Sequence, residues 1–215
     1  GEGKITTELV SDYAEKDTQV DTYVKDIQAE FDELLKTVVA HTDYDLVVND
    51  PATGKRMVRS QETNLGDLCA DAYRTLLGAD IAFVNGGGVR ANIKAGDITY
   101  NDIINVHPFG NMACLIEATG QQILDALELG ASSNPGESGG FLQVSGLTYE
   151  INNYIPSSVK LAEDKSFVSV DGEYRVKNVM VGGQPLDPAK TYKLASHNYM
   201  LKSGGDGYTM FKGDK

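Results

Sequence analysis

The stretch Ile81-Ala-Phe-Val-Asn85-Gly-Gly-Gly-Val-Arg90 decides how the middle of this chain folds. Its first four residues form a short apolar run, which is typical of a buried β-strand. Three glycines follow the asparagine, and glycines permit close backbone approach by a ligand. The planar fork of Arg90 suits a phosphate or a carboxylate. These residues fit equally well a ligand loop, in which Gly88 leaves room for the ligand, and a tight turn beside a surface arginine.

The same loop differs from two common phosphate-binding motifs. A P-loop requires a Lys-Ser/Thr pair after the glycines, and none follows here. The spacing is not G-x-G-x-x-G, and the sequence does not predict a long helix after it. Neither motif therefore assigns a ligand to this loop, and its binding chemistry depends on the glycines, the Asn85 amide and the Arg90 guanidinium.

Upstream, apolar residues at alternating spacings of four and three predict a long helix with one apolar stripe. The stripe consists of Val20, Val24, Ile27, Phe31, Leu34 and Val38. It could bridge to a neighbour, but we favour a helix that covers the core of its own domain. A second helix is predicted to begin near Thr63 or Asn64, either of which could cap it. Its predicted apolar face is Leu65, Leu68, Cys69, Ala72 and Leu76.

Downstream, the pattern changes from helix to strand. A short helical piece near residues 100–106 precedes a predicted buried strand over residues 112–118. Thr119-Gly-Gln-Gln122 matches a capping box and opens another helix. After a loop over residues 130–140 the chain is largely β, with Gly182-Gly183 as a hairpin turn and a strand over residues 192–195. The predicted class is α+β, with mixed α/β layers and no internal repeat.

Composition limits the possible partners. The chain has 215 residues and a net charge of −12, which argues against nucleic acid and anionic membranes as general partners. No apolar run approaches the roughly 18 residues that span a bilayer. The two cysteines, Cys69 and Cys114, lie in apolar segments and are interpreted as buried free thiols. The five arginines are Arg56, Arg59, Arg74, Arg90 and Arg175.

Catalytic motifs are weak. His41, His107 and His197 are far apart and lack metal-ligand spacing, so we expect packed or surface histidines. Gly136-Glu-Ser-Gly-Gly140 fits G-x-S-x-G, but a nucleophile elbow needs a strand before the serine and a helix after it. Here the predicted order is reversed.

A second glycine-rich loop, Ser203-Gly-Gly-Asp-Gly-Tyr208, offers binding chemistry. Asp206 could accept two hydrogen bonds from the vicinal hydroxyls of a ribose, or it could cap its own turn. Phe109, at a turn, and Tyr199, before the glycines, could sandwich a planar base, although an aromatic in either segment is more often core.

Five segments, taken in order, resemble the C-terminal domain of the 5′-nucleotidase family. They are Glu62-Thr-Asn-Leu-Gly-Asp-Leu68, Asn85-Gly-Gly-Gly-Val-Arg90, Pro108-Phe-Gly-Asn111, Gly140-Phe-Leu-Gln-Val-Ser-Gly146 and Gly204-Gly-Asp-Gly-Tyr208. They cover the chain from about residue 55 to its end. The resemblance implies an N-terminal connector region with the long helix over residues 1–45, and a nucleotide-binding domain over residues 46–215.

The resemblance also implies roles for the residues of these motifs. Asn85 is expected to contact the base edge, with Gly88 in the same loop. Arg90 is expected to bind the ribose or phosphate side of the ligand. Phe109 is expected to form one face of a base clamp, and Asp206 to accept the ribose hydroxyls.

Two positions depart from the family pattern. Tyr199 is the natural match for the second face of the clamp, in a segment one residue longer than in relatives. Gln61 stands where many relatives have an arginine, so Arg59 is the candidate for that role.

The implied activity belongs to a larger protein. In this family an N-terminal metallophosphoesterase domain supplies two divalent metal ions and the attacking water, and the enzymes are secreted or surface-anchored. The resemblance therefore implies a nucleotide- or nucleoside-binding domain that holds no metal or cofactor, is inactive alone, and partners that domain of the same chain. The expected location is extracellular, cell-surface or periplasmic. The alternative is a stand-alone, non-catalytic nucleoside-binding or surface interaction module.

Overall fold

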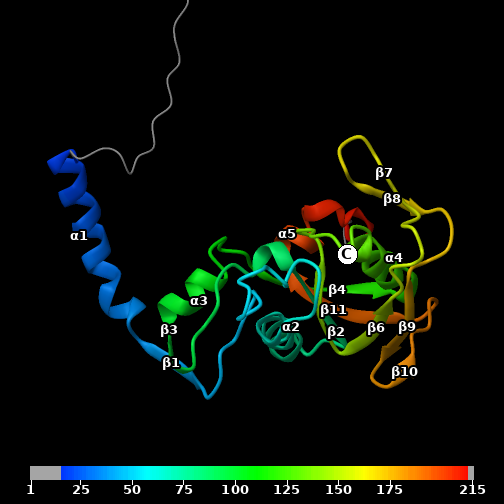
Figure 1. Cartoon of the computed structure of the whole chain (residues 1–215), viewed down its shortest axis with the longest axis horizontal. Helices are drawn as coiled ribbons and strands as arrows, with labels where there is room; N and C mark the ends of the chain where they lie inside the picture. Colours follow the sequence, from blue (N-terminus) through cyan, green and yellow to red (C-terminus); the bar gives the residue numbers. More distant parts are fainter. Residues whose placement is uncertain (1–15, 213–215) are drawn as a thin grey trace, which may run out of the picture.

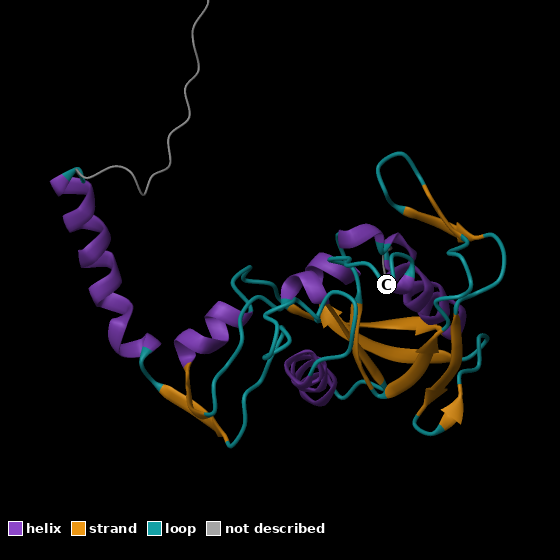
Figure 2. Cartoon of the chain, viewed as in Figure 1, coloured by secondary structure: helices purple, strands orange, loops and turns teal. Residues whose placement is uncertain are grey.

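The computed structural model describes residues 16–212 and confirms the mixed α/β class. Its centre is a four-stranded sheet in the order β4-β11-β2-β5. The strands are β2 (Ile81–Asn85), β4 (Ala113–Thr119), β5 (Leu142–Ser145) and β11 (Thr191–His197). β2 and β11 run parallel, whereas β4 and β5 pair antiparallel at the two edges. Figure 2 shows these strands between the helices.

Helices cover both faces of this sheet (Figure 1). Residues alternate sides along a strand, so β2 contributes to two cores. Ile81 and Phe83 pack with α4 (Gly120–Ala131), whereas Val84 packs with α2 (Asn64–Leu77). All three side chains are fully buried, which places the end of β2, and with it Asn85, between the two cores.

The predicted helix caps are confirmed. Thr63 caps α2 by accepting a hydrogen bond from the backbone N–H of Gly66. Thr119 and Gln122 form the predicted capping box of α4. Each cap joins residues that are three positions apart, so both caps could be predicted from the local sequence alone.

The remaining elements surround this framework. A second sheet has the order β10-β9-β6, and β7 pairs with β8 in a separate hairpin. Their bounds are β6 (Leu147–Ile151), β7 (Val159–Leu161), β8 (Phe167–Val170), β9 (Val176–Val181) and β10 (Gln184–Pro185). Gly182-Gly183 forms the predicted turn between β9 and β10, and the short helix α5 (Asn198–Leu201) follows β11.

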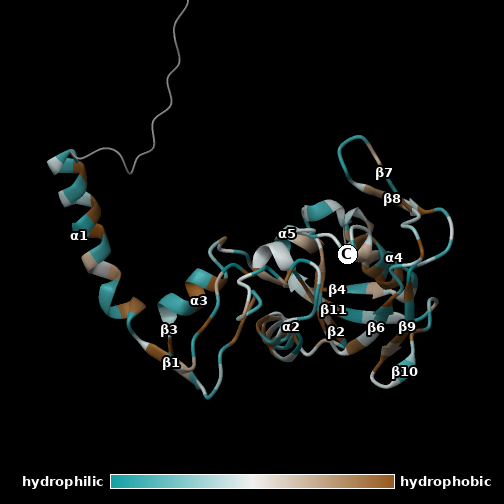
Figure 3. Ribbon diagram, viewed as in Figure 1, coloured by the Kyte–Doolittle hydropathy of each residue, from teal (hydrophilic) through white to brown (hydrophobic). Residues whose placement is uncertain are grey.

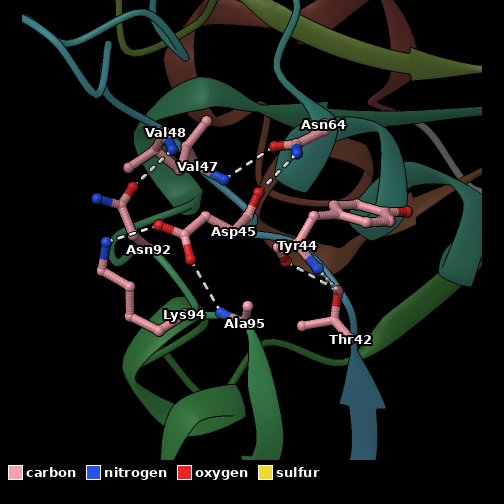
Figure 4. A network of polar contacts seen from close by, with 9 residues as sticks. All are labelled: Thr42, Tyr44, Asp45, Val47, Val48, Asn64, Asn92, Lys94 and Ala95. Carbon is pink, nitrogen blue, oxygen red and sulfur yellow. Dashed lines mark hydrogen bonds and ion pairs between the residues drawn. The ribbon is translucent and has the colours of Figure 1, made fainter.

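The segment before α2 is fastened to the chain beyond the glycine loop (Figure 4). The carboxylate of Asp45 accepts from Lys94 Nζ at 2.6 Å and from the backbone N–H of Ala95 at 2.9 Å. These two hydrogen bonds hold the pKa of Asp45 below its usual value. The side chain of Asn64 bonds to the backbone of residues 45 and 47. The network fixes the start of the segment that carries Arg59.

The N-terminal connector contains one strand, which pairs with a strand that follows the glycine loop. β1 (Val38–Thr42) pairs antiparallel with β3 (Gly96–Thr99), which leads into the predicted short helix α3 (Tyr100–Val106). The boundary that the sequence places between residues 45 and 46 stays a prediction. Residues 1–15 of the connector lie outside the described residues.

The predicted long helix forms as α1 (Thr18–Leu35), but it ends before Val38, which was placed on its stripe and lies in β1. The helix also does not cover its own core. It projects away from the two sheets (Figure 1), and its apolar residues stand out along it in Figure 3. Phe31 is 50% exposed and Leu34 is 52% exposed, so the favoured interpretation of this stripe was wrong. Periodicity identifies the apolar face of a helix but not the surface that it meets.

Two further burial predictions need correction. In α2, the predicted face residues Leu68, Ala72 and Leu76 are exposed, whereas Leu65, Cys69 and Ala70 are buried. The buried face is therefore rotated relative to the predicted one. β4 was predicted as a buried strand, yet its residues alternate between buried and exposed, because only one of its two faces is covered.

Cys69 and Cys114 are buried free thiols, as the sequence predicts. Within residues 16–212, no helix combines the length and the apolar character that a membrane crossing requires.

A buried arginine joins α4 to the second sheet. Arg175 is 4% exposed, and its guanidinium donates to the backbone carbonyls of Ala131, Ser132, Asn134 and Ile155. Glu128, which is fully buried, accepts hydrogen bonds from the backbone N–H groups of residues 175 and 176. Both charged side chains are thus satisfied by the backbone, as burial requires.

Candidate nucleotide-binding site

Three glycine-rich loops meet at the end of β2. The backbone N–H of Gly86 donates to Phe141 O at 2.7 Å, and that of Gly87 donates to Gly139 O at 2.8 Å. A Cβ at position 86 would lie 2.1 Å from Val58 O, so only glycine fits there. The third loop is anchored by the buried Tyr208, whose hydroxyl donates to Gly140 O. The close packing explains why glycines stand at this point of the loop, and whether the loop binds a ligand stays a prediction.

Asp206 is joined to the asparagine of the first loop. Asn85 Nδ2 donates to Asp206 Oδ2 at 2.6 Å, although the two residues are far apart in the sequence. Tyr199 Oη donates to Asp206 Oδ1 at 3.1 Å and accepts from the Asp206 backbone N–H at 3.2 Å. Asp206 itself has a left-handed backbone with φ of 53°. The structure therefore brings three predicted site residues together.

His197 is a member of this network that sequence reasoning missed. Its Nε2 lies 3.1 Å from Asn85 Oδ1, and its side chain is 2% exposed. Burial lowers the pKa of His197 to about 4, so the ring is neutral near pH 7. Its Nδ1 has no hydrogen-bond partner among the described residues. The ring proton therefore belongs on Nε2, which donates to Asn85 Oδ1 and turns Asn85 Nδ2 toward Asp206.

Gly88 makes room for this arrangement. A Cβ at position 88 would lie 2.7 Å from Asn85 Oδ1, closer than real Cβ atoms approach an oxygen. Asn85 is 4% exposed, and its carbonyl oxygen already accepts from His197. Its Nδ2 donates one proton to Asp206, so one Nδ2 proton is left for another partner. Its role at a base edge stays a prediction.

Three of the five arginines gather at one cavity. A cavity of about 340 Å³ is lined by Arg56, Arg59 and Arg90. Glu137 also lines it, and its Oε2 lies 3.7 Å from Arg56 Nη1. Burial lowers the pKa of Arg59, and repulsion from Arg56 and Arg90 lowers it further. Concentrated positive charge in a chain of net charge −12 favours an anionic ligand at this point.

Arg56 is a cavity residue that the sequence motifs do not identify. Its distance of three residues from Arg59 in a loop does not by itself place both side chains at one cavity. A clearer signal would have been the scarcity of arginine combined with two arginines in one short segment.

The two aromatic candidates lie on segments that touch. Phe109 is 60% exposed, and the Arg90 guanidinium carbon lies 5.9 Å from its ring centre. The backbone N–H of Met112 donates to the Asn198 side chain at 2.8 Å, and the Asn198 N–H donates to Met112 O at 2.9 Å. These two bonds join the Phe109 turn to the segment that carries Tyr199. Whether the rings clamp a base stays a prediction.

Two histidines that are distant in the sequence both contact Tyr73. His107 and His197 each make an edge contact with the Tyr73 ring, with ring centres 6.5 and 6.0 Å away. His107 Nε2 lies 3.2 Å from Cys69 Sγ, and His41 is an exposed partner of Asp97.

Over residues 16–212, no group of three or more histidine, cysteine or acidic side chains is placed to hold a metal ion.

The serine motif has no catalytic setting. Ser138 follows α4 and precedes β5, so the helix and strand stand in the order that excludes a nucleophile elbow. Its hydroxyl accepts a hydrogen bond from the Gly140 N–H at 3.2 Å. The loop shapes the backbone beside Asp206.

A second cavity, of about 490 Å³, lies between α2 and β5 and is lined by three acidic residues, Glu62, Asp67 and Asp71. Burial raises the pKa of Asp67 to about 6, with further contributions from Glu62 and Asp71. The folded-state pKa therefore exceeds the ordinary value of about 3.9. Stability from the protonated form is present below pH 4 and is lost as the pH rises through 6.

We expect Asp67→Asn to raise the melting temperature at pH 7.5 and to leave it almost unchanged at pH 4. Thermal unfolding between these pH values would measure the difference. The gain is reduced because an acidic residue in the first turn of a helix is itself favourable. Asp171→Asn, at an exposed position, is the matched control. An equal shift at both pH values would contradict the assignment.

Comparisons with known proteins agree with these features. The profile of the family described as "5′-nucleotidase, C-terminal domain" matches residues 38–213. The chain is 36% identical over 151 residues to Protein UshA of Escherichia coli, covering 70% of this chain and 24% of that protein. It is 39% identical over 152 residues to a 5′-nucleotidase of Vibrio parahaemolyticus, covering 71% and 23%. The crystal structure of a 5′-nucleotidase precursor from Thermus thermophilus superposes with a TM-score of 0.74 at 33% identity, covering 92% and 36%. The chain thus spans about a quarter to a third of the length of these relatives.

Proposed function

The chain belongs to the family of 5′-nucleotidase C-terminal domains, and from this premise we propose that it binds the nucleoside or nucleotide substrate of a phosphoric ester hydrolase. The observation that carries the proposal is the meeting of two kinds of site at the end of β2. A carboxylate acceptor, Asp206, is held by Asn85 and Tyr199. A cationic cavity is lined by the arginines at positions 56, 59 and 90.

The two parts match the two polar ends of a nucleotide. A carboxylate accepts hydrogen bonds from the vicinal hydroxyls of a ribose. Guanidinium groups bind phosphate through charge-assisted and often bidentate hydrogen bonds. The exposed ring of Phe109, at the turn joined to the Tyr199 segment, offers a surface on which a base stacks.

We further propose that hydrolysis takes place with a preceding domain of the same chain. Two divalent metal ions and the attacking water would belong to a metallophosphoesterase domain there. The described part of this chain offers arginines, amides and an aspartate that bind and orient a nucleotide, and Arg59 and Arg90 would hold the phosphate for attack. The proposed location of the whole protein is extracellular, cell-surface or periplasmic.

Titration of adenosine and AMP into the purified chain tests the proposal directly. We expect saturable binding of both ligands and no release of phosphate from AMP in the presence of divalent cations. Turnover by rigorously pure protein would contradict the division of roles. Absence of binding by the folded chain would contradict the proposed function.

Phe109→Ala is the first variant to titrate. Stacking of a base on an aromatic ring contributes about 1–3 kcal/mol. Phe109 lies at an exposed edge, so we expect the lower part of this range, which is about a 5- to 30-fold loss of affinity for both ligands. Tyr154→Ala is the matched control, because Tyr154 is 98% exposed and does not belong to the site. Unchanged affinity in Phe109→Ala would remove Phe109 from the proposed clamp.

A further inference from the structure

The hydroxyl of Tyr199 occupies part of the carboxylate to which we assign the ribose. It donates to Asp206 Oδ1 at 3.1 Å, and the other oxygen, Oδ2, accepts from Asn85 at 2.6 Å. Each carboxylate oxygen of Asp206 therefore already has one protein donor. This arrangement leaves less accepting capacity for a sugar than a free carboxylate would offer.

The two protein donors differ in how firmly they are held. Asn85 is 4% exposed and is fixed from behind by His197 at 3.1 Å. Tyr199 is 39% exposed, but its hydroxyl also accepts from the Asp206 N–H at 3.2 Å. Its ring lies directly over Gly205, where an added Cβ would be 2.4 Å from the ring carbons. The ring is thus tethered at both its face and its hydroxyl.

The tether gives Tyr199 two effects on a bound nucleoside. It holds the ring in one position, so the ring presents a rigid surface at low entropic cost. It also places a donor on Asp206 Oδ1, where one of the two ribose hydroxyls would otherwise donate. A phenylalanine at this position would keep the ring and remove only the donor.

We propose that Tyr199 is a specificity-determining residue that reduces the discrimination between ribonucleosides and 2′-deoxyribonucleosides. The inference rests on the proposed function. With Oδ1 shared by Tyr199, the carboxylate gains little from a second sugar hydroxyl. Loss of the 2′-hydroxyl therefore costs little affinity. The domain accepts both classes of nucleoside.

The test is titration of adenosine and 2′-deoxyadenosine into the wild-type chain, Tyr199→Phe and Asp206→Asn. The quantity of interest is the ratio of the two dissociation constants, because changes in stacking affect both ligands equally and cancel. We expect 2′-deoxyadenosine to bind within about 3-fold of adenosine in the wild type. A hydrogen bond to a charged group changes affinity about 10-fold or more. In Tyr199→Phe the preference for adenosine should therefore rise about 10-fold or more.

Asp206→Asn is the control for the carboxylate, and in that variant the ratio should stay near one. Binding of both ligands by the wild type with an unchanged ratio in Tyr199→Phe would overturn this inference alone. A strong preference for adenosine in the wild type would also overturn it. Failure of the folded wild type to bind either nucleoside would overturn the proposed function and this inference together.

Discussion

Replacement of both Arg59 and Arg90 by alanine is expected to weaken AMP binding by about 100-fold or more, while adenosine binding changes little. Each guanidinium would supply charge-assisted hydrogen bonds to the phosphate, and a hydrogen bond to a charged group contributes about 1.5–3 kcal/mol. Two such losses correspond to at least about 3 kcal/mol, and every 1.4 kcal/mol changes the affinity tenfold. We expect the lower end of the range, because Arg56 remains at the cavity.

Isothermal titration with both ligands at two salt concentrations measures this effect. The matched control is the double variant Lys160→Ala, Lys193→Ala, which removes the same amount of charge at exposed positions. Neither lysine lines the arginine cavity. If the control weakens AMP binding as much as the arginine variant does, the effect is general electrostatic attraction. Equal loss of adenosine and AMP binding would contradict a phosphate site at this cavity.

Arg175→Met is expected to destabilise the chain by about 3 kcal/mol without a direct effect on the nucleotide site. The methionine keeps most of the side-chain volume but removes the donors to four backbone carbonyls. Buried acceptors that lose their donor cost about 1–3 kcal/mol each, and relaxation of the loop after α4 recovers part of this. For a domain of this size, 3 kcal/mol lowers the melting temperature by about 6–12 °C.

Thermal unfolding at pH 7.5 measures the loss, with Lys160→Met as the control. Lys160 is exposed on β7, so its replacement by methionine also exchanges a cationic side chain for an apolar one, but without breaking a buried network. A melting temperature within about 2 °C of the wild type in Arg175→Met would show that the carbonyls find other partners. The role of Arg175 in joining α4 to β9 would then be wrong.

Several short segments could be read correctly from the sequence because their signals are local. The strand at residues 81–85 and the turn at Gly182-Gly183 depend on consecutive residues. The caps at Thr63 and Thr119 depend on side chains three positions from their partners. The order of the glycine motifs also identified the family before any contact was known.

Burial was predicted less well, because it depends on what lies against a face. The stripe of α1 has a helical period, but Phe31 and Leu34 remain exposed in the described part of the chain. In α2 the apolar Leu68 and Leu76 face outward, while the smaller Cys69 and Ala70 meet the sheet. Hydrophobic periodicity locates an amphipathic helix, whereas the facing strands choose which residues pack.

The sequence by itself determined the fold class, the elements around β2 and the candidate residues Asn85, Arg90 and Asp206. Their chemistry is carried by residue type, and their motifs are short. Only the tertiary structure decided that His197, 112 residues from Asn85, orients its amide. The arginine cavity and the tether of Tyr199 on Asp206 are likewise products of packing. Such contacts depend on distances in space, which the order of residues along the chain does not specify.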